Sequence, residues 1–231
     1  MSESNPFGVE TLFHLGPLGV STTVLTSWGV MLLLWLLSML LMRGLRLQPG
    51  GWQTAAEGVI GVIESAINQL LSVEQTRQVM PFVATLWIYL VLANLIGLIP
   101  GLHSPTGDLS ATSALAMLVF LSVHWFGIRA NGLRGYLRHY LKPSPLLLPF
   151  HLISEITRTV ALAVRLFGNI MSLEMAALLI LWVAGLLAPV PILMLHIVEA
   201  LVQAYIFGML ALIYIAGGLQ SQQLRQEKEA Q

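Results

Sequence analysis

Long apolar runs, separated by short polar or proline-containing segments, form the main pattern along this 231-residue sequence. A transmembrane helix needs about 20 apolar residues, because each residue adds about 1.5 Å and the hydrocarbon core is about 30 Å thick. Five segments have the length and composition of membrane spans: 20–42, 81–99, 111–128, 150–188 and 192–219. The pattern therefore predicts an all-α integral membrane protein with five transmembrane helices, folded as a single membrane domain over residues 1–231.

Residues 52–78 have a different pattern, in which charged residues interrupt an apolar stripe. The charged residues are Glu57, Glu64, Glu74 and Arg77, and the apolar residues at helical spacing are Val59, Val62, Ile63, Ala66, Ile67, Leu70 and Leu71. An amphipathic helix of this kind suits the membrane interface, where one face meets lipid and the other meets water. A soluble connector helix is the alternative.

The last two apolar segments are expected to form a long, tilted hairpin. Residues 150–188 contain no proline, and a helix of that length measures about 60 Å, roughly twice the thickness of the hydrocarbon core. Such a helix has to tilt, bend or break. Pro189 and Pro191 end the segment, residues 192–219 return across the membrane, and residues 220–231 form a polar tail.

The composition agrees with a membrane protein and narrows the chemistry. Hydrophobic residues make up 56% of the chain and charged residues 10%, whereas soluble domains have about 25% charged residues. The formal net charge is zero, so nothing indicates a nucleic-acid partner. The sequence has no cysteine, which excludes disulfides, thiolate metal sites and cysteine nucleophiles.

Basic residues predict the orientation in the membrane. Arg158 and Arg165 lie inside apolar sequence, and the other nine basic residues are Arg43, Arg46, Arg77, Arg129, Arg134, Arg138, Lys142, Arg225 and Lys228. With the N-terminus outside and five crossings, all nine fall on the cytoplasmic side, as does the C-terminus, in agreement with the positive-inside rule. No basic segment precedes the first apolar run, so we expect a retained first span in a bacterial inner (plasma) membrane.

Polar and ionisable residues interrupt the last two apolar segments. Residues 150–188 contain Glu155, Arg158, Arg165, Asn169 and Glu174, and residues 192–219 contain His196, Glu199 and Gln203. A charged side chain at mid-membrane costs about 2.5–3.5 kcal/mol on insertion scales, so such residues are expected to face protein or water. Ionisable groups in this position usually mark an ion path.

Helical spacing and a hairpin turn near Gly185 divide these residues into clusters. At about 100° per residue, Arg158, Leu162, Arg165 and Asn169 share one stripe, Glu174 lies nearly opposite Arg165, and the return helix has one stripe of His196, Glu199 and Gln203. The fold then places Gln203 level with Arg165 and Asn169. The outer cluster is Glu174, His196 and Glu199, and the cytoplasmic cluster is Glu155 and Arg158.

Arg165 is expected to be buried between the two clusters. Arginine keeps its positive charge because its pKa exceeds about 12. A fixed positive charge blocks a cation that passes directly between the clusters, whereas a deprotonated carboxylate on a moving partner is attracted to it. Such a carboxylate would take up a cation from one cluster and release it to the other.

Each of these residues also has a structural alternative. Arg165 could be an ion-pair partner of Glu155 or Glu174, and Arg158 could extend to the membrane interface. His196 could be a hydrogen-bonded packing residue, Glu174 and Glu199 could share a proton, and Asn169 and Gln203 could bond across helices. The remaining histidines are scattered and none is interpreted as a metal ligand: His14, His103, His124, His139 and His151.

Three segments resemble subunit a of rotary (F-type) ATP synthases. Ala161-Leu-Ala-Val-Arg165-Leu-Phe-Gly-Asn169 is similar to the family's signature segment. Residues 196–207, with Gln203 and Phe207, are similar to its last helix, and Asn94-Leu-Ile-Gly-Leu-Ile-Pro100 is similar to an earlier one. The resemblance extends from about Thr54 to Gly218, and the segment around Arg165 is highly specific.

The resemblance implies an ion-translocating stator subunit that packs against a rotating ring of c subunits, with peripheral stalk b subunits and the lipid bilayer as further partners. Arg165 then matches the essential arginine, Gln203 the facing glutamine, Asn169 the asparagine one turn on, and Glu174 the outer half-channel carboxylate beside His196. Leu173 and Glu199 depart from the pattern of many members, which leaves the outer route and the choice between H⁺ and Na⁺ open.

No phosphate-binding G-x-x-x-x-G-K-[ST] motif occurs, so no direct nucleotide binding, no catalytic role and no cofactor are expected. A self-contained ion channel or secondary transporter is the alternative function, although no internal repeat is evident. A membrane scaffold without an ion path is a third alternative, which the charged residues inside the spans disfavour.

Overall fold

The computed structural model describes residues 11–15, 18–43, 50–99, 102–141, 148–185, 188 and 190–229. In chain order its elements are β1 (Thr11–Leu15), β2 (Leu18–Ser21), α1 (Thr22–Arg43), α2 (Gly51–Asn68), α3 (Val73–Leu95), the 3₁₀ turns η1 (Ile96–Leu98) and η2 (Pro105–Gly107), α4 (Leu109–Leu141), α5 (Leu148–Ala184) and α6 (Val190–Glu229). Within these residues, five helices are long and apolar enough to cross a membrane. The predicted class, an all-α membrane protein with five long apolar helices, is confirmed.

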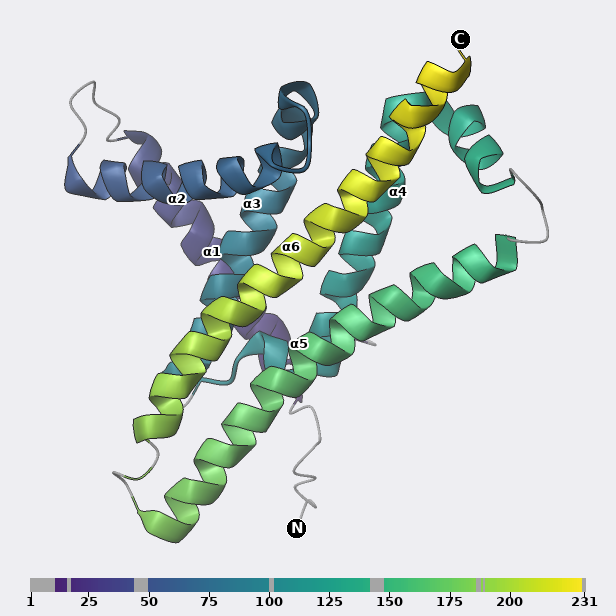
Figure 1. Ribbon diagram of the computed structural model, residues 1–231. Coiled ribbons are helices and arrows are strands. Elements are labelled where there is room, and N and C mark those ends of the chain that lie inside the picture. The colour runs from purple at the N-terminus through teal and green to yellow at the C-terminus, as the bar shows by residue number, and fades with distance from the viewer. Residues whose placement is uncertain are drawn as a thin grey trace.

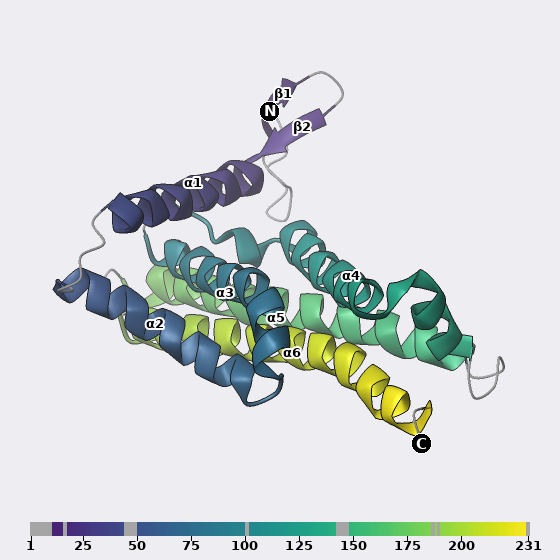
Figure 2. The same ribbon diagram turned by 90° about the horizontal axis from the view of Figure 1, so that it is seen from above.

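The two longest helices, α5 and α6, form an antiparallel hairpin that lies obliquely across α3 and α4 (Figure 1). Seen from above, α5 and α6 lie on one side of α3 and α4, and α1 lies on the other side (Figure 2). Helix α6 contacts both α3 and α4, and α5 contacts α4. The fold therefore packs the hairpin against two shorter spans, while α1 and α2 contact α3.

A short hairpin of β1 and β2 precedes α1, and the sequence pattern did not predict it. The strands pair antiparallel, with Phe13 opposite Val20 and Leu15 opposite Leu18. The first span was predicted from residue 20, but the helix begins at Thr22. The hydroxyl of Ser21 accepts a hydrogen bond of 3.3 Å from the N–H of Val24, so Ser21 caps the start of the helix.

The predicted helix over residues 52–78 is divided in the structure. Helix α2 ends at Asn68, and α3 begins at Val73, eight residues before the predicted start of the second span. The side chain of Gln75 accepts a hydrogen bond of 3.3 Å from the N–H of Ser72, which caps the new helix ahead of Pro81. Pro81 thus lies inside α3 instead of starting it, and its carbonyl accepts a hydrogen bond of 2.7 Å from the Thr85 hydroxyl.

Helix α4 extends beyond the third predicted span at both ends. It begins at Leu109, where the Asp108 carboxylate accepts a hydrogen bond of 2.8 Å from the N–H of Ser110. The apolar part ends at Ala130. Gly132 has a φ of +70°, and this left-handed residue kinks the chain before the basic part of the helix continues to Leu141.

The turn between α5 and α6 lies at Gly185, as the sequence predicted. Helix α5 ends at Ala184, and Gly185 has a φ of +82°, with its N–H donating to the carbonyl of Leu181 at 3.2 Å. The predicted end at residue 188 was therefore too late. The apolar part of α6 ends at Leu219, and the helix continues through the polar tail to Glu229; residues 230 and 231 lie outside the described part.

Small residues allow close packing between α3 and α6. A Cβ atom added to Gly208 would lie 2.7 Å from Nε1 of Trp87, so the α6 backbone touches the indole ring. The Trp87 ring also stacks on Tyr205, with a centroid distance of 5.7 Å. Fully buried Ala200 and Ala204 lie on the same helix. Close backbone approach at small residues is typical of helix packing in membranes.

Candidate functional site

A hydrogen bond joins α5 to α6 near the middle of the candidate site. Nδ2 of Asn169 donates to Oε1 of Gln203 at 2.8 Å. Gln203 is 1% exposed, and its Nε2 has no hydrogen-bond partner among the described residues. The structure thus places Gln203 level with Asn169, and leaves a buried amide with N–H groups available to a water molecule or to a partner.

Arg165 is exposed, so the expectation that this chain buries it was wrong. Its guanidinium forms no hydrogen bond or ion pair with any residue that the structure describes. Its neighbours Val160 and Val164 are more than half exposed, and a Cβ added to Gly168 would meet open space. The helix therefore presents a guanidinium, unpaired among the described residues, beside exposed apolar side chains.

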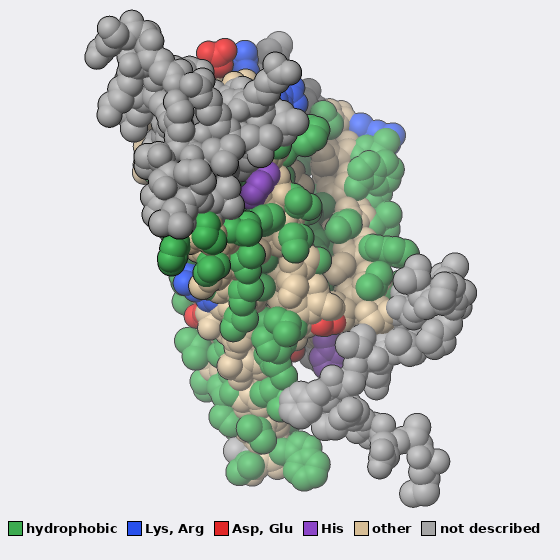
Figure 3. Space-filling view, turned by 90° about the vertical axis from the view of Figure 1, so that its right-hand side faces the viewer, with side chains coloured by type: hydrophobic (Ala, Val, Ile, Leu, Met, Phe, Trp, Pro, Cys, Tyr) green, Lys and Arg blue, Asp and Glu red, His purple; other side chains and the backbone are tan. Residues whose placement is uncertain are grey.

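The exposed position of Arg165 argues against a purely structural role as an ion-pair partner within the chain. An ion pair of Arg165 with Glu155 or Glu174 does not form in the described structure, where both carboxylates have other partners. Apolar side chains cover large parts of the face seen in Figure 3, with few charged side chains among them. An unpaired guanidinium in a largely apolar face within a membrane span is costly unless a partner of opposite charge meets it.

Glu174 points to the other side of α5, toward the segment that connects α3 to α4. Its Oε1 accepts a hydrogen bond of 3.2 Å from the backbone N–H of Ser104. A Cβ added to Gly97 would lie 3.0 Å from Oε1, and one added to Gly107 would lie 3.1 Å from Oε2. The carboxylate therefore fits between two positions that have no side chain, and His103 is near enough to act on it electrostatically.

A buried polar network links this carboxylate to α6. The Thr106 hydroxyl donates to Oδ1 of Asn94 at 2.7 Å and lies 2.6 Å from the Ser104 hydroxyl. Nδ2 of Asn94 donates to the carbonyl of Ala200 at 3.1 Å. Sequence reasoning missed Ser104, Thr106 and Asn94 as site residues. The available signals were an asparagine inside an apolar span and two hydroxyls in a polar loop.

His196 and Glu199 reach the same network from α6. His196 is 2% exposed, the backbone of Asn94 faces its ring, and its Nε2 has no hydrogen-bond partner in the described structure. Glu199 is partly buried and near enough to His196 to act on it electrostatically. The structure therefore gathers the predicted outer cluster, Glu174, His196 and Glu199, around the end of α3 and η2.

Glu155 and Arg158 lie at the other end of α5 and contact two different helices. Oε2 of Glu155 lies 3.7 Å from Nε2 of His124 on α4, whose Nδ1 lies 2.8 Å from the carbonyl of Phe120. The Arg158 guanidinium lies 4.7 Å from the centre of the Tyr214 ring on α6, a cation–π contact. Sequence reasoning read His124 as a scattered histidine, and it did not consider Tyr214.

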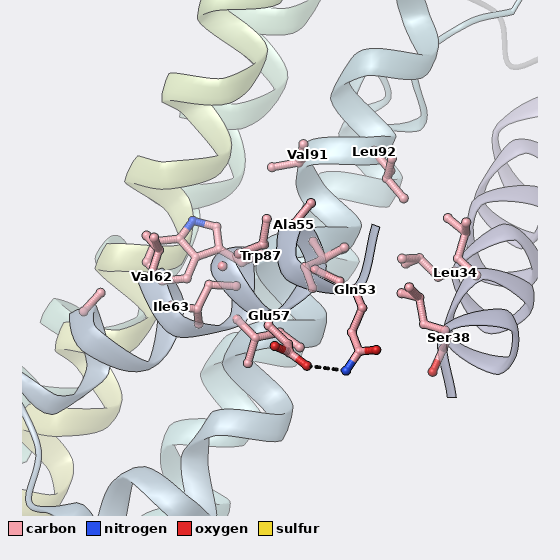
Figure 4. Close-up of a pocket in the computed structure, with 18 of the residues that line it drawn as sticks. Leu34, Ser38, Gln53, Ala55, Glu57, Val62, Ile63, Trp87, Val91 and Leu92 are labelled. Atoms are coloured by element: carbon pink, nitrogen blue, oxygen red, sulfur yellow. Dashed lines mark hydrogen bonds between the residues drawn. The ribbon is translucent and has the colours of Figure 1, made fainter. Parts of the chain in front are cut away.

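An apolar cavity of about 1150 Å³ lies between α1, α2, α3 and α6 (Figure 4). Its lining includes Leu34, Ile63 and Trp87, and a polar pair at its edge in which Nε2 of Gln53 donates to Glu57 at 2.8 Å. None of the predicted ion-path residues lines it. A cavity with so few polar groups offers little to a passing ion, so the candidate site remains the polar clusters along α5 and α6.

Comparisons with known proteins all find similarity to the same ATP synthase subunit. Residues 24–216 match the family model of the ATP synthase A chain. The chain is 66% identical over 216 residues to ATP synthase subunit a 2 of Pelobacter propionicus, with 94% of each chain covered. It is 65% identical to ATP synthase subunit a 1 of Hahella chejuensis, covering 92% of this chain and 91% of the relative. It is 56% identical to ATP synthase subunit a of Legionella pneumophila, covering 94% and 95%.

Proposed function

This chain belongs to the ATP synthase A chain family and is a non-catalytic, ion-translocating membrane subunit of an F-type ATP synthase, and we propose that it passes ions to and from a rotating c-ring through two separate half-channels. Ion flow in one direction then drives rotation and ATP synthesis, and ATP hydrolysis drives pumping in the other direction. The c-ring, the peripheral stalk b subunits and the bilayer are the proposed partners.

The observation that carries the proposal is the exposure of Arg165 without a partner among the residues that the structure describes. A guanidinium stays charged at any pH the membrane meets, so it repels a cation and attracts a carboxylate. A ring carboxylate that approaches this face loses its bound cation in favour of the guanidinium. Arg165 thereby forces each ion to leave on one side and to be replaced from the other.

The two polar clusters supply the two half-channels. Glu174 lies nine residues after Arg165 on α5 and Glu155 lies ten residues before it, which separates each from the arginine by about 15 Å along the helix axis. Glu174, His196 and Glu199 form the proposed outer half-channel. Glu155 and Arg158 belong to the proposed cytoplasmic half-channel, together with His124.

Asn169 and Gln203 complete the site beside Arg165. Asn169 lies about one turn after the arginine, and its hydrogen bond to Gln203 ties this turn of α5 to α6. The unpartnered Nε2 of Gln203 is a donor that a water molecule or the ring carboxylate could accept from. The transported ion is H⁺ or Na⁺, and no cofactor takes part in the proposed transfer.

The distribution of basic residues supports an orientation for the proposed outer half-channel. The positive-inside rule puts the N-terminus outside and the C-terminus in the cytoplasm of a bacterial inner membrane. Glu174 and η2 then lie toward the outside.

Replacement of Arg165 tests the proposal in the assembled complex. Arg165→Ala in membrane vesicles should abolish ion-driven ATP synthesis while the complex still assembles. Coupled synthesis that survives the substitution would refute the role. A second measurement distinguishes this function from that of a self-contained channel. The purified subunit in liposomes should conduct no ions until a c-ring is added. Strong flux through the subunit alone would favour the channel.

A further inference from the structure

We propose that Ser104 and Thr106 position the Glu174 carboxylate, and that the Thr106 hydroxyl anchors the η2 turn that holds it. The inference rests on the proposed role of Glu174 in ion transfer and adds the residues that set its place. Neither hydroxyl has to touch the ion. Both act through the backbone that binds the carboxylate.

The place of Glu174 depends on where the η2 backbone lies. The only hydrogen bond to its carboxylate in the described structure comes from the N–H of Ser104, at 3.2 Å. Gly97 and Gly107 lie so close that a Cβ at either position would press on a carboxylate oxygen. Because the carboxylate lies close to the backbone on both sides, we expect a small shift of the turn to move the N–H away from it or to displace it.

The Asn94 amide fixes the direction of the hydrogen bonds that hold the turn. Its Nδ2 donates to the carbonyl of Ala200 at 3.1 Å, and the opposite amide orientation would set two acceptor oxygens against each other. Oδ1 therefore faces Thr106, and the Thr106 hydroxyl has to donate to it, at 2.7 Å. A hydroxyl has one proton, so Thr106 has none left for Ser104.

The Ser104 hydroxyl lies within hydrogen-bond distance of two oxygens. It lies 2.6 Å from the Thr106 oxygen and 2.8 Å from the carbonyl of Ala93, with one proton for two acceptors. It donates to the carbonyl of Ala93 or to the Thr106 oxygen, and either bond ties Ser104 to its neighbours in this network. The contacts continue from Ser104 through Thr106 and Asn94 to Ala200, four residues after His196.

Loss of the Thr106 hydroxyl would interrupt this hydrogen-bond network at its centre. Asn94 is 0% exposed and Thr106 1% exposed, so no bulk water replaces the lost donor. Without the hydroxyl, Oδ1 of Asn94 is buried without a donor, which is unfavourable. Ser104 also loses the hydroxyl that lies 2.6 Å from its own. The turn is expected to move, and the N–H that binds Glu174 moves with it.

The test uses the assembled complex in membrane vesicles and compares Thr106→Val with Thr106→Ser. The rate of ion-driven ATP synthesis is measured per assembled complex against the external concentration of H⁺ and, separately, of Na⁺. Thr106→Val should lower the rate roughly fivefold, the value of one hydrogen bond, and shift the ion concentration that gives half the maximum rate. Thr106→Ser keeps the hydroxyl, so its rate and its half-maximal ion concentration should be close to those of the unmodified complex.

Thr112→Val is the matched control. Thr112 is 0% exposed, and in the described part of the chain its hydroxyl donates to the backbone carbonyls of Asp108 and Leu109 alone. Thr112→Val should leave both quantities nearly unchanged. If Thr106→Val changes only the amount of assembled complex, or changes the rate and the half-maximal concentration no more than Thr112→Val does, the positioning role is overturned.

Glu174→Gln separates this inference from the function on which it rests. If Glu174→Gln leaves the rate unchanged, the role of Glu174 itself fails. If Glu174→Gln lowers the rate and Thr106→Val does not, the ion path stands and the positioning role fails. A lowered rate in both variants, with rescue by Thr106→Ser, supports both.

Discussion

Asn169 on α5 donates a 2.8 Å hydrogen bond to Gln203 on α6, and this bond sets the register of the two long helices at the turn that follows Arg165. The two residues are 34 positions apart in the chain, on opposite sides of the hairpin. Because the bond involves two side-chain amides in a mostly apolar interface, it specifies one register where apolar contacts alone would tolerate several. The position of Arg165 relative to α6 follows from that register.

A double-mutant cycle tests this relationship. Asn169→Leu and Gln203→Leu should each lower the free energy of unfolding of the purified subunit by about 1–3 kcal/mol, because each leaves a polar group without its partner. The double variant should cost less than the two losses added together, by about 1 kcal/mol. Denaturant unfolding in detergent measures all three. Strict additivity would show that the two amides do not interact.

Replacement of Arg165 should separate stability from function. In the purified subunit, Arg165→Leu should change the free energy of unfolding by less than about 0.5 kcal/mol, since the side chain is exposed and unpaired. Loss of one partner from a buried ion pair would cost about 3–5 kcal/mol instead. Thermal unfolding in detergent distinguishes the two values. A loss of several kcal/mol would mean that Arg165 has a structural partner within the chain.

The contact between Gly208 and Trp87 should be sensitive to a single methyl group. Gly208→Ala places a Cβ 2.7 Å from the indole, and overpacking of this kind costs about 1–3 kcal/mol. Gly217→Ala on the same helix is the control, because its Cβ would meet no atom within 4 Å. The control should be neutral or stabilising, since alanine favours a helix over glycine by about 1 kcal/mol. Equal effects of the two substitutions on thermal unfolding would contradict the packing described for α3 and α6.

Glu174 and Glu199 should act together in the outer half-channel. Glu174→Gln with Glu199→Gln should slow ion uptake from the outer side by roughly tenfold, because the path loses both of its carboxylates. The amount of assembled complex should stay the same. Ion flux into vesicles and the yield of purified complex are the two measurements. Unchanged flux in the double variant would show that ions take another route.

The sequence determined the elements whose cause is local. Five apolar runs of sufficient length make five long apolar helices, because a helix satisfies its own backbone hydrogen bonds wherever it lies in lipid. Gly185 marked the hairpin turn, because a left-handed residue ends a helix at low cost. Helical spacing placed Gln203 level with Asn169. Each of these follows from residues that are close in the chain or from the geometry of a single helix.

Only the tertiary structure decided which face of each helix meets the rest of the chain. Spacing gives the angle between Arg165 and Glu174 on α5, but it does not say which of them faces inward. Packing of α5 against α4, α6 and η2 left Arg165 exposed and turned Glu174 toward Ser104. The network through Asn94 and Thr106 joins segments that lie far apart in the chain. Such contacts depend on how whole helices pack. The periodic spacing of apolar residues shows that a helix has a buried face, but not which other helix covers that face.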